Sequence, residues 1–209
     1  MLIAITRKIS PRMRECQLTH LGRAPIDVSR AAEQHRAYEK CLEGLGCRVE
    51  SLPAEPEQPD SVFVEDAAAV FDELAILARP GAESRRAEVA SVGRALEPHC
   101  KLARIEAPGT LDGGDVLTVG KQVFVGLSRR TNQAGFEQVR ALLPVYGYSV
   151  ESVPVGRCLH LKSAVSQVAE GTLLINPAWL ERRAFGDFEW IEVDPEEPFA
   201  ANALLGTER

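Results

Sequence analysis

Short apolar runs along the chain alternate with segments in which apolar residues recur every three or four positions. The runs predict strands, and the spaced segments predict amphipathic helices. Near the N-terminus the pattern predicts a strand at 2–6, a basic, turn-rich loop or lid at 8–26, a helix that begins at Asp27 or Ser29, and a strand at 47–52. Aspartate and serine are favoured helix N-caps, and Gly44 and Gly46 end the apolar stripe of this helix.

Beyond residue 60 the same order of elements recurs three times: two strands, a helix and a further strand. The first strands of the three units are expected at 61–70, 116–119 and 163–168, and the third helix is expected to be short, near 179–183. Runs such as AAAV and VFVG, apolar at nearly every position, are typical of strands covered on both faces. A period of about 50 residues indicates stacked or circular repeats. The sequence therefore predicts an α/β fold in which residues 1–209 form one domain of ββαβ units.

The two ends of the chain do not complete this pattern. The first unit has only a strand, a helix and a strand, and a last unit begins with a strand expected at 199–205. A circular arrangement would then lack a closing piece on the order of 45 residues. Because an open ring leaves strand edges unpaired, self-association is favoured and a homo-oligomer is one expected state.

Composition limits the classes of partner. The chain of 209 residues carries a net charge of −6 and has no basic block, so neither nucleic acid nor an anionic membrane is expected to bind it. No apolar run approaches the roughly 18 residues of a membrane span. The N-terminus, MLIAITRKIS, is apolar first and basic afterwards, the reverse of a signal peptide, which predicts a cytoplasmic protein. Five scattered cysteines without zinc spacing predict reduced thiols.

The repeat makes polar residues of different units comparable. Asp60, Asp112 and His160 stand just before or at the start of the first strand in successive units. If the units lie around one axis, these side chains meet near its centre. A histidine alone is more often an ordinary interior side chain, but a histidine beside carboxylates is suited to general acid/base catalysis.

The stretch PGTLDGGDVL places Gly113 and Gly114 between Asp112 and Asp115. Glycine lets another backbone or a ligand come close, so this pair predicts a tightly shaped site. Carboxylates here, with Arg129 and Arg130 one hairpin further on, are suited to a zwitterion that is cationic at one end and anionic at the other.

Five blocks of this sequence resemble the dimethylarginine dimethylaminohydrolase family, within the guanidino-group-modifying superfamily. These blocks are PDSVFVEDAA (59–68), ARPGAESRR (78–86), PGTLDGGDVL (108–117), VGLSRRTN (125–132) and LHLKSAVS (159–166). The resemblance implies a five-bladed α/β propeller, C-terminally incomplete in this chain. It also implies hydrolysis of Nω-methylated L-arginine to L-citrulline and methylamine or dimethylamine, with no cofactor and no metal.

The resemblance carries over to individual positions. It implies that His160 is the catalytic histidine and that Asp112 orients it. It implies a substrate-binding set in which acids hold the guanidinium, arginines grip the α-carboxylate and a lid residue covers the site: Asp60, Glu65 and Asp66; Arg85 and Arg130; and Leu18. The less favoured alternative for Arg85 is an ordinary solvated arginine near a helix start. Arg129 is the member of its pair expected in solvent, and Lys162 is expected in a structural ion pair.

The family reaction also needs a cysteine nucleophile close to the C-terminus, and no cysteine of this chain matches that motif. Cys158 lies two residues before His160, on the same face of an extended segment, so its side chain is expected to point parallel to the imidazole. An ordinary thiol, with a pKa of about 8.5, is also mostly protonated at neutral pH. The chain as given is therefore expected to be inactive or nearly so.

Three alternatives remain open at this point. The chain is part of a longer enzyme, a non-catalytic protein that binds guanidino compounds or a protein partner, or a relative that acts on arginine, citrulline or agmatine. The pair Arg85 and Arg130 favours a ligand with an α-carboxylate and so argues against agmatine.

Overall fold

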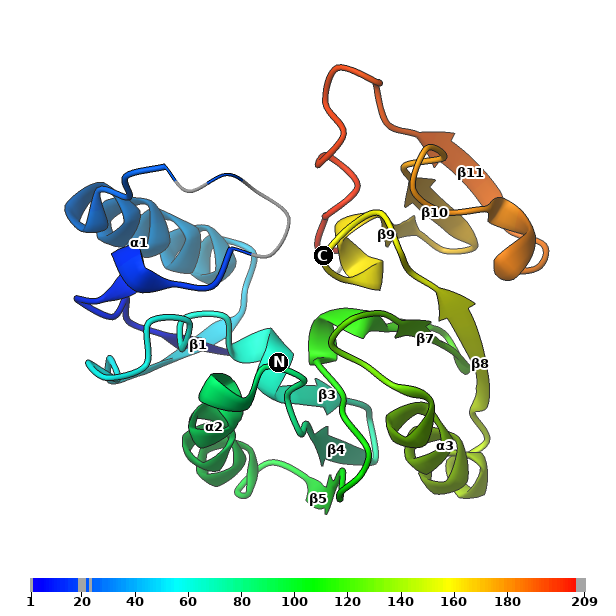
Figure 1. Cartoon of the computed structure of the whole chain (residues 1–209), viewed down its shortest axis with the longest axis horizontal. Helices are drawn as coiled ribbons and strands as arrows, with labels where there is room; N and C mark the ends of the chain where they lie inside the picture. The colour runs from blue at the N-terminus through cyan, green and yellow to red at the C-terminus, as the bar shows by residue number, and fades with distance from the viewer. Residues whose placement is uncertain (1, 19–21, 23, 206–209) are drawn as a thin grey trace.

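The computed structural model describes residues 2–18, 22 and 24–205, which form four α/β units around a common centre (Figure 1). The α/β class predicted from the pattern is confirmed. Among the described residues, no helix is long and apolar enough to cross a bilayer.

The N-terminal unit consists of a strand, a helix and a strand, as predicted. Strands β1 (Ile3–Arg7) and β2 (Arg48–Leu52) pair in parallel, and α1 (Val28–Gly44) connects them. Helix α1 begins where Asp27 accepts hydrogen bonds from the N–H groups of Ser29 and Arg30. The side chain of Asp27 thus satisfies N–H groups that have no partner within the helix. Of the two predicted caps, Asp27 and Ser29, Asp27 is the N-cap.

Each of the next three units is a three-stranded sheet in which an antiparallel hairpin is followed by a parallel third strand. The second unit contains β3 (Ala68–Val70), β4 (Leu74–Leu77), α2 (Val89–Leu96) and β5 (Lys101–Arg104). The third contains β6 (Val116–Val119), β7 (Gln122–Leu127), α3 (Gln133–Leu142) and β8 (Ser149–Pro154). The fourth contains β9 (Val165–Ala169), β10 (Thr172–Ile175), the 3₁₀ turn η7 (Arg182–Ala184) and β11 (Glu189–Glu192), so the helix expected near 179–183 is only this short turn.

A 3₁₀ turn precedes the first strand of each of these units; the strand predicted at 116–119 is confirmed as β6, whereas those predicted at 61–70 and 163–168 begin later, at Ala68 and Val165. These turns are η2 (Val64–Ala67), η4 (Gly113–Asp115) and η6 (Leu161–Ser163). The strand expected at 61–70 is therefore wrong over 61–67, where Phe63 N–H donates to the Asp60 carbonyl and Asp66 N–H to the Phe63 carbonyl. Such bonds between residues three apart remove these backbone groups from a strand ladder.

The strand expected at 199–205 is also wrong. Residues 198–201 form a turn, and no regular element follows it up to residue 205. Side chains rather than a strand ladder hold this segment: Ser166 Oγ donates to the Ala201 carbonyl and Asn176 Nδ2 to the Pro198 carbonyl.

The apolar core lies between neighbouring units. One cluster joins Phe71 and Ile76 of the second unit to Val125 and Phe136 of the third, and another joins Phe124 of the third unit to Leu173 of the fourth. The apolar positions expected to face inward from α2 and α3 are all buried: Val89, Val92, Leu96, Phe136, Val139 and Leu143. The polar 3₁₀ turns η2, η4 and η6 lie just before β3, β6 and β9.

Candidate active site

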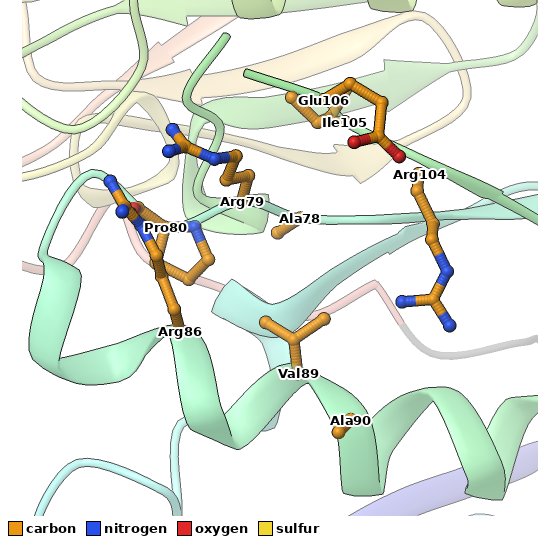
Figure 2. A pocket seen from close by; sticks show the side chains of 9 residues that line it. All are labelled: Ala78, Arg79, Pro80, Arg86, Val89, Ala90, Arg104, Ile105 and Glu106. Atoms are coloured by element: carbon orange, nitrogen blue, oxygen red, sulfur yellow. The ribbon is translucent and has the colours of Figure 1, made fainter. Parts of the chain in front are cut away.

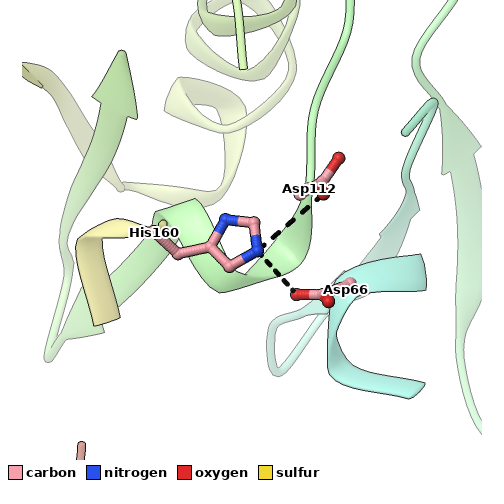
Figure 3. A group of neighbouring side chains, drawn as sticks. All are labelled: Asp66, Asp112 and His160. Carbon is pink, nitrogen blue, oxygen red and sulfur yellow. Dashed lines mark ion pairs between the residues drawn. The ribbon is translucent and has the colours of Figure 1, made fainter. Parts of the chain in front are cut away.

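The three 3₁₀ turns bring carboxylates from two units against one imidazole. His160 precedes η6, Asp66 lies in η2, and Asp112 and Asp115 bracket the glycines of η4; we call these four side chains the acid–imidazole cluster. His160 Nε2 lies 3.6 Å from Asp66 Oδ1 and 3.9 Å from Asp112 Oδ2, with the ring pointing between the two acids (Figure 3). His160 Nδ1 lies 3.4 Å from Asp115 Oδ2. Asp112 and Asp115 are fully buried, and His160 is 6% exposed.

The Gly113–Gly114 pair makes this approach sterically allowed. A Cβ on Gly113 would lie 2.0 Å from the Glu65 carbonyl oxygen, and a Cβ on Gly114 would lie 2.8 Å from both Asp66 Oδ1 and the His160 ring. Neither glycine has a positive φ. The prediction of a tightly shaped site is confirmed, and its cause is the close approach of other groups rather than an unusual backbone conformation.

Asp115 was expected as one of the two acids beside the glycine pair, but its contact with His160 was not predicted. Its Oδ1 accepts from the Leu161 N–H at 2.9 Å, and its Oδ2 accepts from the hydroxyls of Ser128 and Thr131 at 2.7 Å each. Asp115 thus ties the β7 hairpin to the turn that carries His160. The second aspartate of the DGGD motif was the available signal.

Burial and charge give the groups of the cluster different proton affinities. Burial alone would lower the pKa of His160, but Asp115, Asp66 and Asp112 outweigh it and the pKa is raised above the usual value. Burial raises the pKa of Asp112 to about 6, although the Gly81 N–H, at 2.9 Å, opposes this shift. Burial also opposes ionisation of Asp66, but His160 and Arg85 overcome it and lower the pKa. Two neighbouring carboxyls with pKa values shifted in opposite directions are typical of acid/base sites.

Both predicted carboxylate-binding arginines lie beside the cluster. Arg85 Nη1 donates to Asp66 Oδ2 at 2.6 Å, and Arg130 Nη1 lies 3.5 Å from Asp112 Oδ2. Arg85 is 4% exposed and Arg130 6%, so the alternative of a solvated Arg85 is wrong. Arg129 is exposed, as expected.

Asp60 is buried but takes a different place from the one its position in the repeat suggested. Its carboxylate accepts from the Gln17 N–H at 3.0 Å, and its carbonyl accepts from Arg85 Nη2 at 3.2 Å. Among the described acids in η2 and in the turn before it, Asp66 faces His160 and Asp60 does not. The reason is local: the 3₁₀ turn rotates successive side chains by about a third of a turn, which a strand would not do.

The remaining predicted residues lie at the edge of this region. Glu65 is exposed and pairs with Lys162 Nζ at 2.6 Å, which confirms the structural ion pair expected for Lys162. Leu18 is half-buried and follows Gln17, whose N–H binds Asp60. A cavity of about 190 Å³ opens between Gln17, Asp60, Ser84, Arg85 and Glu88.

A second cavity, of about 240 Å³, lies elsewhere, beside the start of α2 and the end of β5 (Figure 2). Two of its arginines are bound to backbone: Arg79 Nη1 donates to the Gly109 carbonyl and Arg86 Nε to the Pro80 carbonyl. Neither cavity is lined by a member of the acid–imidazole cluster, but the 190 Å³ cavity includes Arg85, which contacts Asp66. The chemistry therefore favours the cluster as the functional site.

The cluster is suited to a cation. Ligand atoms of Asp66, Asp112 and His160 all lie within 4.8 Å of one another, a spacing compatible with a divalent metal ion or with the flat face of a planar organic cation. Two arginines next to the acids supply anion-binding groups a short distance away. This arrangement fits an organic molecule with a cationic end and an anionic end.

Comparison with known proteins agrees with this chemistry. A family profile described as "N,N dimethylarginine dimethylhydrolase, eukaryotic" matches residues 21–184. The N(G),N(G)-dimethylarginine dimethylaminohydrolase of Streptomyces coelicolor is 45% identical over 172 residues, which cover 82% of this chain and 67% of that protein. The chain belongs to the dimethylarginine dimethylaminohydrolase family.

A second dimethylarginine dimethylaminohydrolase, from Pseudomonas aeruginosa, is 38% identical over 193 residues, which cover 91% of this chain and 75% of the relative. The crystal structure of a cysteine-to-serine mutant of the P. aeruginosa enzyme, complexed with citrulline, superposes with a TM-score of 0.94. That alignment covers 100% of this chain and 83% of the mutant enzyme. The described residues therefore have the fold of the dimethylarginine dimethylaminohydrolase family, and both relatives are longer than this chain.

Cys158 is poorly placed to serve as the nucleophile expected in a dimethylarginine dimethylaminohydrolase. Its thiol is 6% exposed and donates to the His160 carbonyl at 3.1 Å. Burial, aided by Asp115, raises the pKa of Cys158 to about 11. A thiol that stays protonated is a weak nucleophile. All five cysteines are unbridged, as expected.

Proposed function

We propose that this chain carries the substrate site of a hydrolase acting on Nω-methylated L-arginine, a reaction that gives L-citrulline and methylamine or dimethylamine. The observation that carries the proposal is the buried imidazole of His160 between Asp66, Asp112 and Asp115. Buried acids outnumber the buried cationic side chains described around them, so the region attracts a cation.

Each end of such a substrate has matching groups. Asp60 and Asp66 are acceptors suited to the N–H groups of a guanidinium, with Glu65 as a further acidic contact at the edge. Arg130 and the Nη1 side of Arg85 are suited to the α-carboxylate. Leu18 would cover the bound molecule. These binding roles rest on the resemblance and on the positions of the side chains beside the cluster.

The proposed chemistry divides between His160 and a thiolate. Attack of a thiolate on the guanidinium carbon gives a tetrahedral adduct, and the imidazolium of His160 protonates the departing amine. Neutral His160 then takes a proton from water as the water attacks the thiouronium carbon, which releases the ureido product and the thiolate. Asp112 would orient the ring. Because Cys158 is buried and protonated, we propose that the chain by itself binds substrate without turnover.

A second candidate is a non-catalytic binder of guanidino compounds or of a protein partner on the same fold. It is favoured by the same observation about Cys158, since a cation site without a competent thiol can only bind. A related hydrolase acting on arginine or citrulline is the remaining alternative. A cytoplasmic location, self-association and the lack of nucleic-acid binding stay predictions.

Calorimetric titration of the purified chain, combined with a citrulline assay, tests the proposal. We expect dimethylarginine to bind, agmatine to bind more weakly because it lacks the carboxylate, and no citrulline to form. The variant Cys158→Ser should bind with unchanged affinity. Citrulline formation that disappears in Cys158→Ser would show that Cys158 is the nucleophile. Absence of binding to any of these ligands would overturn the guanidinium site.

The affinity for a guanidinium ligand is expected to rise as the pH increases through the range around pH 6. The pKa of Asp112 is about 6, so its carboxyl gains a negative charge within this range. The pKa of His160 is raised, so its ring loses a positive charge at higher pH. Both changes favour a bound cation, by up to about tenfold per pH unit for each linked proton. Titration calorimetry across this range measures the slope, which Asp112→Asn should reduce near pH 6; an affinity that falls with pH would contradict the assignment.

A further inference from the structure

Glu88 is a buried acid outside the predicted site. It is 3% exposed and lies at the end of the 3₁₀ turn η3 (Glu83–Glu88), three residues after Arg85. Residues three apart on a 3₁₀ turn lie on the same face, so the two side chains meet directly. Its carboxylate accepts from Arg85 Nε at 3.2 Å and from Arg85 Nη2 at 2.9 Å, a two-point contact with one edge of the guanidinium.

The other edge of Arg85 faces the cluster. Nη1 donates to Asp66 Oδ2 at 2.6 Å, while Nη2 also donates to the Asp60 carbonyl at 3.2 Å. Asp66 Oδ1 in turn lies 3.6 Å from His160 Nε2. Glu88, Arg85, Asp66 and His160 thus form a continuous series of contacts from the start of α2 to the imidazole.

The geometry points to Glu88 as a positioning residue, which holds Arg85 in the orientation that fixes Asp66 and presents the Nη1 edge to a ligand. The planar guanidinium has a rigid set of donors, so an anchor on one edge determines where the opposite edge points. Glu88, Arg85 and Asp60 also line a common cavity of about 190 Å³, so the Glu88–Arg85 contact lies at the wall of an open space beside the cluster. Burial raises the pKa of Glu88, a cost that its contacts with Arg85 oppose. The inference deepens the proposed function and rests on it.

Two substitutions of Glu88 separate positioning from charge. Glu88→Gln removes the charge and keeps the length, whereas Glu88→Asp keeps the charge and shortens the reach by one methylene group. If Glu88 positions Arg85, both variants should bind dimethylarginine roughly tenfold or more weakly, a loss typical of residues that orient a ligand-contacting group. In an Arg85→Lys background, where the two-edge contact is absent, Glu88→Gln should cause no further loss.

The matched control is Glu83→Gln, on the same turn. The side chain of Glu83 is 86% exposed and pairs with Arg86. The Glu83→Gln substitution should therefore leave the affinity for dimethylarginine unchanged. Wild-type affinity in both Glu88 variants would overturn the inference. A loss confined to Glu88→Gln would also overturn it, because a purely electrostatic effect needs no defined geometry.

A ligand-free measurement keeps this test separate from the proposed function. If the wild-type chain binds no guanidino compound, the proposed function fails, but the pKa of His160 can still be followed by NMR titration. Glu88→Asp should lower that pKa because Asp66 is no longer fixed against the ring, and Glu83→Gln should not. An unchanged His160 pKa in Glu88→Asp would show that Glu88 is merely structural.

Discussion

Gly113→Ala is expected to destabilise the protein by about 3 kcal/mol or more, enough to unfold a marginally stable domain. The new Cβ would lie 2.0 Å from the Glu65 carbonyl oxygen and 2.8 Å from that of Ala68. Both obstacles are backbone atoms, which a change of rotamer cannot move. Since η2 and η4 must separate to make room, the acid–imidazole cluster should be lost together with stability. Denaturant titration followed by circular dichroism measures the change.

Gly156→Ala is the control for this experiment. A Cβ on Gly156 meets no atom within 4 Å, and the residue does not have a positive φ, so its substitution should change the free energy of unfolding little. If Gly113→Ala unfolds at the same denaturant concentration as Gly156→Ala, the packing of η4 against η2 is not as described.

Asp66→Asn is expected to weaken dimethylarginine binding on the order of 100-fold. The carboxylate contributes charge-assisted hydrogen bonds, each worth about 1.5–3 kcal/mol, and tenfold in affinity corresponds to about 1.4 kcal/mol. Asp66 is also the acid that pairs with Arg85 at 2.6 Å and faces His160. The neutral variant should therefore lower the pKa of His160 as well. Titration calorimetry and NMR titration measure the two effects.

Asp72→Asn makes the same change of charge in an exposed bend between β3 and β4 of the same unit. It should alter neither the affinity nor the pKa of His160, because exposed charges are screened by solvent and salt. Equal effects of the two variants would mean that general electrostatics rather than contact with Asp66 controls binding.

Much of the architecture could be predicted because it repeats. Apolar positions spaced along α2 and α3 indicated their buried faces, and polar turns, two of them with a glycine, marked the limits of strands. The shared place of Asp112 and His160 in successive units predicted their meeting, and they lie 3.9 Å apart. Periodicity is a property that local sequence carries directly, so it needs no knowledge of distant contacts.

The contacts that the sequence did not predict all depend on packing across the fold. The run VFVEDAAAV is apolar enough to indicate one strand, yet its first part is a 3₁₀ turn that presents Asp66 instead of Asp60 to the ring. Glu88 is charged and close to a helix start, a pattern that usually indicates a solvated side chain. Only the structure shows that Glu88 is buried against Arg85, the contact on which its proposed positioning role depends.

Residue patterns were enough to predict the repeated α/β units, the tightly shaped site at the glycine pair and the family to which the chain belongs. These follow from patterns of neighbouring residues, whose spacing reflects backbone geometry. Only the folded chain shows that 3₁₀ turns present these residues, that Asp115 holds the loop of His160, and that burial raises the pKa of Asp112 to about 6. Distances between units and the loss of solvent around a charge arise only when the chain is packed, so no local pattern encodes them.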